Sequence, residues 1–313
     1  MKSKKEQLSL LFKGVAMGAA DVVPGVSGGT IAFISGIYEE LLSTISSIKP
    51  ALLKPLLQGK FKAFWKEING GFLAPLLAGI AISVLSLAKV ISWMLENEPV
   101  LLWSFFFGLV LASIFLVGKQ VERWNIGSIA AFILGAGLAF WITLLPPLAP
   151  STSLWFLFFS GAIAICAMIL PGISGSFILL ILGSYKIVID AVKGFEIKEI
   201  IVFAAGCLLG LLSFSRLLKW LFAKFQNTTI AVLTGFLLGS LNKLWPWKEN
   251  VQLLYTHSDG KEDFLQENIS PFALENPQLL GVSVLFILGI LIIVALEIWS
   301  RNNEKKTKLN AEQ

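Results

Sequence analysis

One short motif interrupts two long apolar segments of this chain and recurs at a fixed spacing. The first copy reads Pro-Gly-Val-Ser-Gly at 24–28, and the second reads Pro-Gly-Ile-Ser-Gly at 171–175. A Gly-x-Tyr triplet follows each copy, ending at Tyr38 and Tyr185, again 147 positions apart. Because proline and glycine disfavour a continuous helix, neither segment is expected to be one straight helix. The spacing predicts an internal duplication with a broken segment in each copy.

The duplication extends past the motif at a shorter spacing. Five residues are matched 127 positions later, four by the same residue and Lys89 by an arginine: Gly79, Ser86, Lys89, Gly108 and Ser113 correspond to Gly206, Ser213, Arg216, Gly235 and Ser240. The Phe-Ile-Leu-Gly sequence at 132–135 also recurs at 286–289. The change of spacing places extra residues in the first copy near 47–66 and in the second copy within 245–277.

Composition places both copies in a membrane. Apolar residues make up 56% of the 313, charged residues only 14%, and the mean hydropathy is +0.78. A soluble domain carries roughly a quarter charged residues. Apolar runs of about 20 residues are long enough to span a bilayer as helices. We therefore predict an all-α integral membrane protein.

The apolar runs predict the same content for each copy, one broken segment followed by three transmembrane helices. The first repeat, 1–147, has its broken segment at about 9–46 and helices at about 71–94, 100–118 and 127–145. The second repeat, 148–300, has a broken segment at about 154–192, helices at about 199–221, 228–244 and 278–300, and a polar outer loop at 245–277. Residues 301–313 are predicted to be a cytoplasmic tail.

The odd number of spans in each copy predicts that the two repeats have inverted topology. With both termini in the cytoplasm, 18 of the 25 Lys and Arg residues lie in cytoplasmic connections and six lie outside. This distribution follows the positive-inside rule. The charges do not distinguish hairpins that stop half-way from hairpins that cross fully. The central position of each Pro-Gly break favours re-entrant helical hairpins.

Each break would leave backbone amides able to bind an anion. Half-helices that begin after Ser27 and Ser174 would present first-turn N–H groups and the positive end of the helix dipole. Two such ends entering from opposite faces are typical of transporters built from inverted repeats. The predicted substrate-binding residues are Ser27, Gly28, Gly29 and Thr30 in the first copy and Ser174, Gly175 and Ser176 in the second. The simpler alternative is that the serines cap helices and the glycines permit close packing.

Three charged residues are further candidates. Asp21 precedes the first break, where the second copy has Met168. A carboxylate at membrane depth is a candidate for proton coupling, unless it is neutral or caps a helix end. Lys89 and Arg216 occupy matched positions in the opposed copies. Each could receive an anionic head group on its own side, or simply extend into the headgroup layer.

No catalytic or metal-binding motif accompanies these residues. The single histidine, His257, lies in the polar outer loop, and the two cysteines, Cys166 and Cys207, lie in apolar runs. The sequence contains no HExxH motif and no P-loop. We therefore expect no metal, no cofactor, no nucleic-acid partner and no enzymatic activity.

The residues also carry a family resemblance. The stretch MGAADVVPGVSGGT at 17–30, the Gly-Ile-Tyr-Glu that follows and the second Pro-Gly-Ile-Ser-Gly copy resemble bacterial polyprenyl-phosphate transporters of the PopT type. The resemblance covers about 9–300, although Ser176 stands in the second copy where the first has Gly29. It implies translocation of undecaprenyl phosphate from the outer to the inner leaflet of the bacterial cytoplasmic membrane, which recycles this lipid carrier for cell-envelope synthesis.

On this interpretation the half-helix amides hold the phosphate, Lys89 and Arg216 pass it between the faces, and Asp21 couples movement to a proton. Two other functions stay open. Some intramembrane phosphatases acting on polyprenyl diphosphates also use inverted repeats with re-entrant hairpins, and a transporter of another small anion would fit the same amides. The sequence leaves open the coupled ion, the oligomeric state, the prenyl chain length and the role of the loop 245–277.

Overall fold

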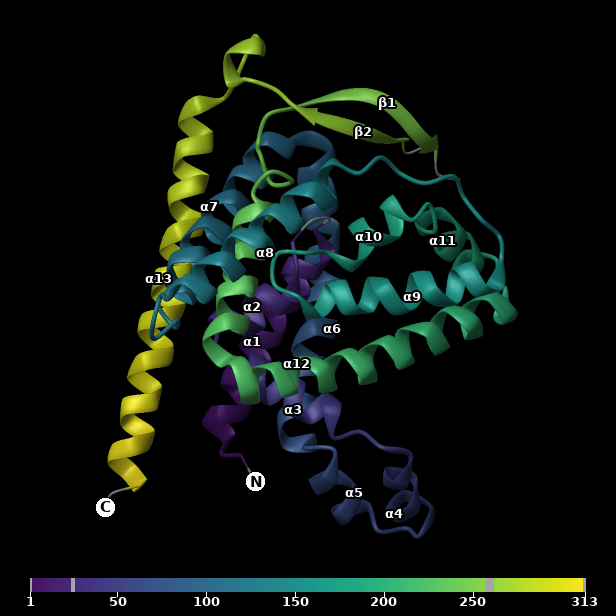
Figure 1. The fold of residues 1–313 in the computed structure, drawn as a ribbon, viewed down its shortest axis with the longest axis vertical. Helices are drawn as coiled ribbons and strands as arrows, with labels where there is room; N and C mark the ends of the chain where they lie inside the picture. The colour runs from purple at the N-terminus through teal and green to yellow at the C-terminus, as the bar shows by residue number, and fades with distance from the viewer. Residues whose placement is uncertain (1, 24–25, 257–261, 312–313) are drawn as a thin grey trace.

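The computed structural model describes residues 2–23, 26–256 and 262–311 (Figure 1). Pro24 and Gly25 of the first motif and His257 lie outside the described residues. The described chain is mostly helical, in agreement with the predicted all-α class, but it also contains one two-stranded antiparallel sheet.

In the first half of the chain, one long helix is followed by two short helices and then by three long ones. These are α1 (Lys4–Val22), α2 (Gly28–Ile34), α3 (Tyr38–Ser46), α6 (Gly70–Asn97), α7 (Pro99–Gly118) and α8 (Ile126–Leu144), with a 3-10 turn at Pro50–Leu52 and the small helices α4 (Leu53–Leu57) and α5 (Phe61–Glu67) between α3 and α6. The break that the motif predicts lies between α1 and α2.

The second half contains α9 (Leu154–Ile169), α10 (Gly175–Ile181), α11 (Tyr185–Lys193), α12 (Ile197–Ser240) and α13 (Leu279–Ala311). Between α12 and α13 lie the strands β1 (Lys248–Thr256) and β2 (Glu262–Asn268) and a 3-10 turn at Pro271–Ala273. The predicted break falls between α9 and α10.

One predicted connection is a sharp bend in the structure. The sequence predicts separate helices at 199–221 and 228–244, and α12 consists of two helical parts in these regions, joined across a kink. The helix bends at Phe225, whose φ of −135° and ψ of 46° are not helical. The polar residues at 224–228 suggested a loop, but this stretch contains neither proline nor glycine to end a helix.

Local sequence signals explain where several helices begin and turn. Ser3 and Glu6 form a capping box at the start of α1, and the side chain of Asn125 caps α8. The turns from α2 to α3 and from α10 to α11 use Gly36 and Gly183 at φ of +73° and +65°. Glycine adopts this left-handed backbone without the steric cost that a side chain would add.

Within the described residues, five helices are long and apolar enough to cross a membrane, namely α6, α7, α8, α12 and α13. The number is up to six if α10 and α11, which are bent by 108° relative to each other, are counted as one broken span. The helix α9 is apolar but shorter. The chain is therefore a multi-pass helical membrane protein by length and composition.

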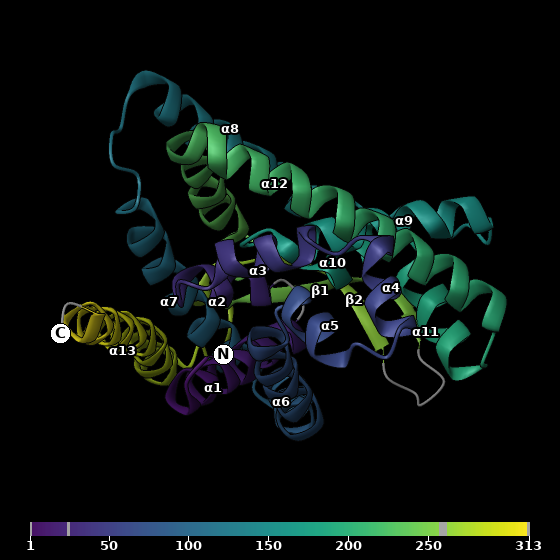
Figure 2. The same cartoon turned by 90° about the horizontal axis from the view of Figure 1, so that it is seen from below.

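Helices α1 and α6 pack closely, as do α9 and the first part of α12 (Figures 1 and 2). A Cβ on Gly79 of α6 would overlap the carbonyl oxygen of Leu11 of α1. Likewise, a Cβ on Gly206 of α12 would overlap the carbonyl oxygen of Phe158 of α9. The two glycines are 127 positions apart and the two carbonyl residues are 147 apart, which are the spacings of the duplicated motifs.

The other two close pairs are α7 with α13 and α8 with the second part of α12. A Cβ on Gly108 of α7 would overlap the carbonyl oxygen of Phe286 of α13. A Cβ on Gly235 of α12 would likewise overlap the carbonyl oxygen of Phe132 of α8. These residues also match between the two copies. Small residues of this kind let helix backbones approach closely in lipid.

The molecule has two different ends along its long axis. Figure 1 shows the start of α1, the end of α13 and the helices α4 and α5 at one end, and the β1–β2 hairpin at the other. The indole nitrogens of Trp245 and Trp247 hold the chain beside the hairpin by donating to the carbonyl oxygens of Ile269 and Pro277, each at 2.9 Å. The short helix α2 lies between these ends, and all seven of its residues are buried.

Candidate functional site

The two interrupted segments meet in the interior of the molecule. Ser27 Oγ donates a hydrogen bond to the carbonyl oxygen of Met168 at 2.9 Å. In the reverse direction, the amide of Gly172 donates to Thr30 Oγ1 at 2.9 Å. The start of α2 is therefore bound to the main chain of the second break by two hydroxyl groups. Sequence reasoning named Ser27 and Thr30 but did not predict their partners.

Two further features fit the first segment against the second. Tyr38, at the start of α3, donates its hydroxyl to the carbonyl oxygen of Ile169 at 3.2 Å and is buried. Gly29 approaches the same carbonyl oxygen so closely that a Cβ would overlap it. Gly172 has a φ of +85°, a conformation that favours glycine. The motif glycines thus have a packing role at this junction.

The first-turn amides of α2 already have acceptors in this structure. The amide of Gly28 donates to Asp21 Oδ1 at 2.7 Å, and the amide of Gly29 donates to Ser27 Oγ at 3.0 Å. The amide of Thr30 donates to the carbonyl oxygen of Ser27 at 2.9 Å. The carboxylate of Asp21 therefore occupies the position at which an oxyanion would be bound, and Ser27 caps the helix.

The start of α10 is arranged differently. Ser174 is its N-cap by backbone geometry, but its side chain makes no capping hydrogen bond. Instead, the hydroxyls of Ser174 and Ser176 lie 2.8 Å apart. Among the described residues, none accepts a hydrogen bond from the amides of Gly175, Ser176 or Phe177. Of the two predicted anion sites, the second therefore has the more available donors.

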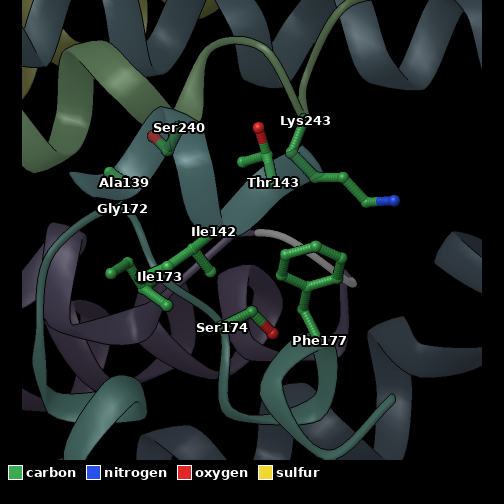
Figure 3. A pocket seen from close by; sticks show the side chains of 9 residues that line it. All are labelled: Ala139, Ile142, Thr143, Gly172, Ile173, Ser174, Phe177, Ser240 and Lys243. Carbon is green, nitrogen blue, oxygen red and sulfur yellow. The ribbon is translucent and has the colours of Figure 1, made fainter. Parts of the chain in front are cut away.

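A small pocket opens beside Ser174 (Figure 3). It is lined by α8, α10, the second break and the end of α12, through Ala139, Ile142, Thr143, Gly172, Ile173, Ser174, Phe177, Ser240 and Lys243. Its free volume of about 10 Å³ has room for about one water molecule. A phosphate group therefore requires these elements to move apart.

Lys243 is the cationic residue of this pocket, and sequence reasoning did not select it as a site residue. Its Nζ lies 4.7 Å from the centre of the Phe177 ring, which places a positive charge beside the first turn of α10. Figure 3 shows the lysine side chain extending past this ring. In the sequence, Lys243 lies at the end of the predicted helix 228–244, and it was used only as one of the six cations predicted to lie outside.

The structure does not bring Arg216 to either break. Its Nε donates to the carbonyl oxygen of Ser46 at 3.4 Å, and its Nη2 donates to the carbonyl oxygen of Ile48 at 3.0 Å. The guanidinium thus binds the carbonyl end of α3, where a cation is favourable. Lys89 is exposed on α6, and no hydrogen bond joins it to another described residue.

No group of three or more His, Cys, Asp or Glu side chains that could hold a metal ion occurs within the described ranges. Both cysteines are free and lie near main-chain oxygens of neighbouring helices. Cys166 Sγ is 3.6 Å from the carbonyl oxygen of Gly210, and Cys207 Sγ is 3.5 Å from that of Gly161. Both cysteines thus have packing contacts between α9 and α12.

Comparisons with known proteins identify relatives of this chain. Residues 17–262 match the model of a family described as VCA0040-like, undecaprenyl phosphate translocase-like. A protein of Vibrio cholerae named polyprenyl-phosphate transporter is 47% identical over 295 residues, which cover 93% of this chain and 96% of that protein. A polyprenyl-phosphate transporter of Staphylococcus aureus is 30% identical over 256 residues, covering 75% of this chain and 85% of that protein.

No solved structure matches this chain significantly. The family match, at residues 17–262, includes both breaks and all the residues that line the pocket. The Vibrio cholerae relative extends the similarity over nearly the full length of both chains. The chain therefore belongs to the VCA0040-like, undecaprenyl phosphate translocase-like family.

Proposed function

We propose that this protein carries polyprenyl phosphate across the bacterial cytoplasmic membrane, from the outer to the inner leaflet. This step would return undecaprenyl phosphate, the lipid carrier of envelope polymers, to the side on which it is loaded. The family and both named relatives support the substrate. The structural observation that carries the proposal is the junction of the two breaks, Ser27 with Met168 and Thr30 with Gly172. There, two helix starts meet within one buried region.

The architecture that we propose for this transport is a pair of inverted repeats, each with a re-entrant hairpin. The matched close contacts of α1 with α6 and of α9 with α12 support two equivalent halves. A further matched pair adds support, since Gly135 lies under the carbonyl oxygen of Val232 and Gly289 under that of Phe105. Inverted repeats can exchange an outward-open and an inward-open state by small movements of one half against the other.

Charge placement supports an orientation with both termini in the cytoplasm. The end of the molecule with α4 and α5 carries the basic connection 47–66, and the start of α1 and the end of α13 lie at the same end (Figure 1). By the positive-inside rule this end faces the cytoplasm. The β1–β2 hairpin and Lys243 then face outward, and Arg216 faces inward.

The phosphate would be held by the two helix starts in turn. On the outward-facing side the amides of Gly175 and Ser176 and the hydroxyl of Ser174 are the first donors. The second set, Ser27 to Thr30, becomes available only when the Asp21 carboxylate leaves the Gly28 amide. Protonation of Asp21 would favour this exchange, which is how we propose that a proton takes part. Lys89 and Arg216 remain proposed head-group residues at the membrane surfaces.

The proposal is tested in cells that lack their own translocases for this lipid. Undecaprenyl phosphate exposed at the outer surface is measured with and without the protein, together with released inorganic phosphate. We expect the intact protein to clear the outer pool without releasing phosphate. Ser27→Ala with Ser174→Ala, and separately Arg216→Ala, are expected to clear it more slowly at equal expression.

Two outcomes contradict the proposal. An unchanged outer pool with hydrolysis of the polyprenyl diphosphate would assign the protein to the intramembrane phosphatases. Strong competition by soluble phosphate or sulfate, with no effect on the lipid pool, would indicate transport of a small anion instead. A non-enzymatic transporter predicts neither result.

A further inference from the structure

Two lysines lie together at the end of the molecule that carries the β1–β2 hairpin. Lys248, the first residue of β1, donates from Nζ to the carbonyl oxygen of Lys243 at 2.6 Å. The same Nζ lies 4.0 Å from the centre of the Trp103 ring of α7, and Trp103 is buried. Lys243 in turn lies over Phe177 at the start of α10. The pair thus forms a chain of positive charge from the hairpin to the second break.

This positive charge is not balanced by an acidic side chain. Elsewhere in the described chain, Lys2 forms an ion pair with Glu40 and so joins the residues just before α1 to α3. Neither Lys243 nor Lys248 forms an ion pair with a described residue. The aromatic faces beside them contribute only a modest cation–π attraction. Two adjacent cations held in partly buried positions without an anion are costly, unless a ligand supplies the negative charge.

The lowered pKa values of the two amines also favour a bound anion at this position. Burial lowers the pKa of Lys243 below its ordinary value of 10.5. Burial, together with the nearby charge of Lys243, lowers the pKa of Lys248 well below the same value. A bound anion would oppose both effects because it favours the charged form of each amine.

We propose that Lys243 and Lys248 receive the phosphate head group of the lipid before it reaches Ser174. The ligand is a phosphate monoester on a long apolar tail, and this assignment rests on the proposed transport function. Lys248 is the first contact beneath the β1–β2 hairpin, and Lys243 is the second, within the pocket. From Lys243 the head group reaches the available amides of α10 without crossing the buried region around α2.

The outer loop also has a structural role beside the two lysines. Asn268, at the end of β2, donates from Nδ2 to the carbonyl oxygen and to Oδ1 of Asn242, at 2.8 and 3.0 Å. Asn242 in turn donates to Thr143 Oγ1, one of the pocket-lining groups, at 2.7 Å. The end of β2 is therefore tied to the pocket-lining Thr143 through Asn242, the residue before Lys243.

The test uses the full chain in lipid nanodiscs, with undecaprenyl phosphate and undecaprenol as probes. These two lipids have the same tail and differ in the phosphate. Lys243→Met and Lys248→Met keep most of the side-chain volume and remove the charge. We expect each to weaken binding of the phosphate lipid by about tenfold and to leave binding of the alcohol unchanged. Lys243→Arg and Lys248→Arg should restore most of the affinity.

Lys186→Met is the matched control, because Lys186 is an exposed lysine on α11, in the same half of the chain. It should bind both lipids as the wild type does. A purely structural role of Lys243 and Lys248 would instead weaken both lipids equally or neither, and this result would overturn the inference.

A second measurement needs no variant. Undecaprenyl phosphate should slow acetylation of Lys243 and Lys248 in the wild-type protein, read by mass spectrometry, whereas undecaprenol should not. Equal acetylation with both lipids would overturn the inference even if the Met variants do not fold. Failure of the wild type to prefer the phosphate lipid would instead contradict the proposed function itself. The two failures are therefore distinguishable.

Discussion

Ser27 Oγ donates to the carbonyl oxygen of Met168, 2.9 Å away, although the two residues are 141 positions apart in the chain. Ser27 Oγ also accepts a hydrogen bond from the amide of Gly29 at 3.0 Å. One hydroxyl therefore caps α2 and also joins the first break to the second. Ser174, the matched serine, does neither, since its hydroxyl contacts that of Ser176. The two copies of the motif are thus chemically alike and structurally different.

This difference predicts unequal effects of the two serine substitutions. Ser27→Ala removes a helix cap and a buried hydrogen bond and should lower the free energy of unfolding by about 1–3 kcal/mol. Ser174→Ala should cost less, roughly 1 kcal/mol or below, because it removes one contact with another hydroxyl. Thermal unfolding of the purified variants in detergent measures both. A larger loss for Ser174→Ala would contradict the asymmetry.

The close helix contacts predict which glycines tolerate a methyl group. Gly135 of α8 lies under the carbonyl oxygen of Val232, whereas Gly137, two residues later, has nothing within 4 Å of an added Cβ. Gly135→Ala should destabilise the protein by about 1–3 kcal/mol through overpacking. Gly137→Ala should be neutral or stabilise by up to about 1 kcal/mol, because alanine is the better helix former. The same unfolding assay compares the two.

Gly289 extends this test to the other half of the chain. It lies under the carbonyl oxygen of Phe105, the contact equivalent to that of Gly135 under the proposed duplication. Gly289→Ala should therefore destabilise as much as Gly135→Ala does. A neutral Gly289→Ala beside a damaging Gly135→Ala would argue against equivalent halves.

Much of the helical arrangement is predictable because lipid leaves few choices for the backbone. Twenty-residue apolar runs identify α6, α7 and α13, and the motif marks the breaks before α2 and α10. The polar stretch at 224–228 marked the division of α12 at Phe225, where the backbone leaves helical geometry. The β1–β2 hairpin was missed, since it lies in a polar segment that carries no apolar periodicity.

The candidate site was predictable only in part. Motif spacing selected Ser27, Thr30 and Ser174, but a linear sequence does not say that Ser27 reaches Met168 or that Asp21 occupies the Gly28 amide. These contacts depend on how two distant segments pack together. Lys243 was missed for the same reason, since its neighbour Phe177 is far away in the chain.

The contact between Asp21 and Gly28 predicts opposite changes in binding and transport. Asp21→Asn keeps an oxygen that can accept from the Gly28 amide but removes the negative charge. Because a phosphate near this amide would no longer be repelled, affinity for undecaprenyl phosphate should rise, by roughly threefold to tenfold. Transport in proteoliposomes should fall, since the proposed proton step is lost.

Glu39→Gln is the control for Asp21→Asn, because Glu39 is an exposed carboxylate at the start of α3. It should change neither binding nor transport. Unchanged transport in Asp21→Asn would remove Asp21 from the coupling step. Weaker binding would show that its carboxylate supports the phosphate site instead of competing for the amide.

Lys248 predicts a pH dependence of stability with a definite sign. Burial holds its pKa in the folded protein well below 10.5, whereas the unfolded chain has the ordinary value. Between these two pKa values the unfolded state binds more protons, so the free energy of unfolding rises with pH over this window. The rise should be smaller in Lys248→Met, measured as the melting temperature in detergent from about pH 7 to about pH 10.

Saturating undecaprenyl phosphate should also reduce the rise in the wild type, because a bound anion returns the pKa of Lys248 towards its ordinary value. If the melting temperature rises equally with pH in the wild type and in Lys248→Met, the amine of Lys248 stays solvated in the folded protein. If the lipid leaves the rise of the wild type unchanged, Lys248 does not contact the phosphate head group.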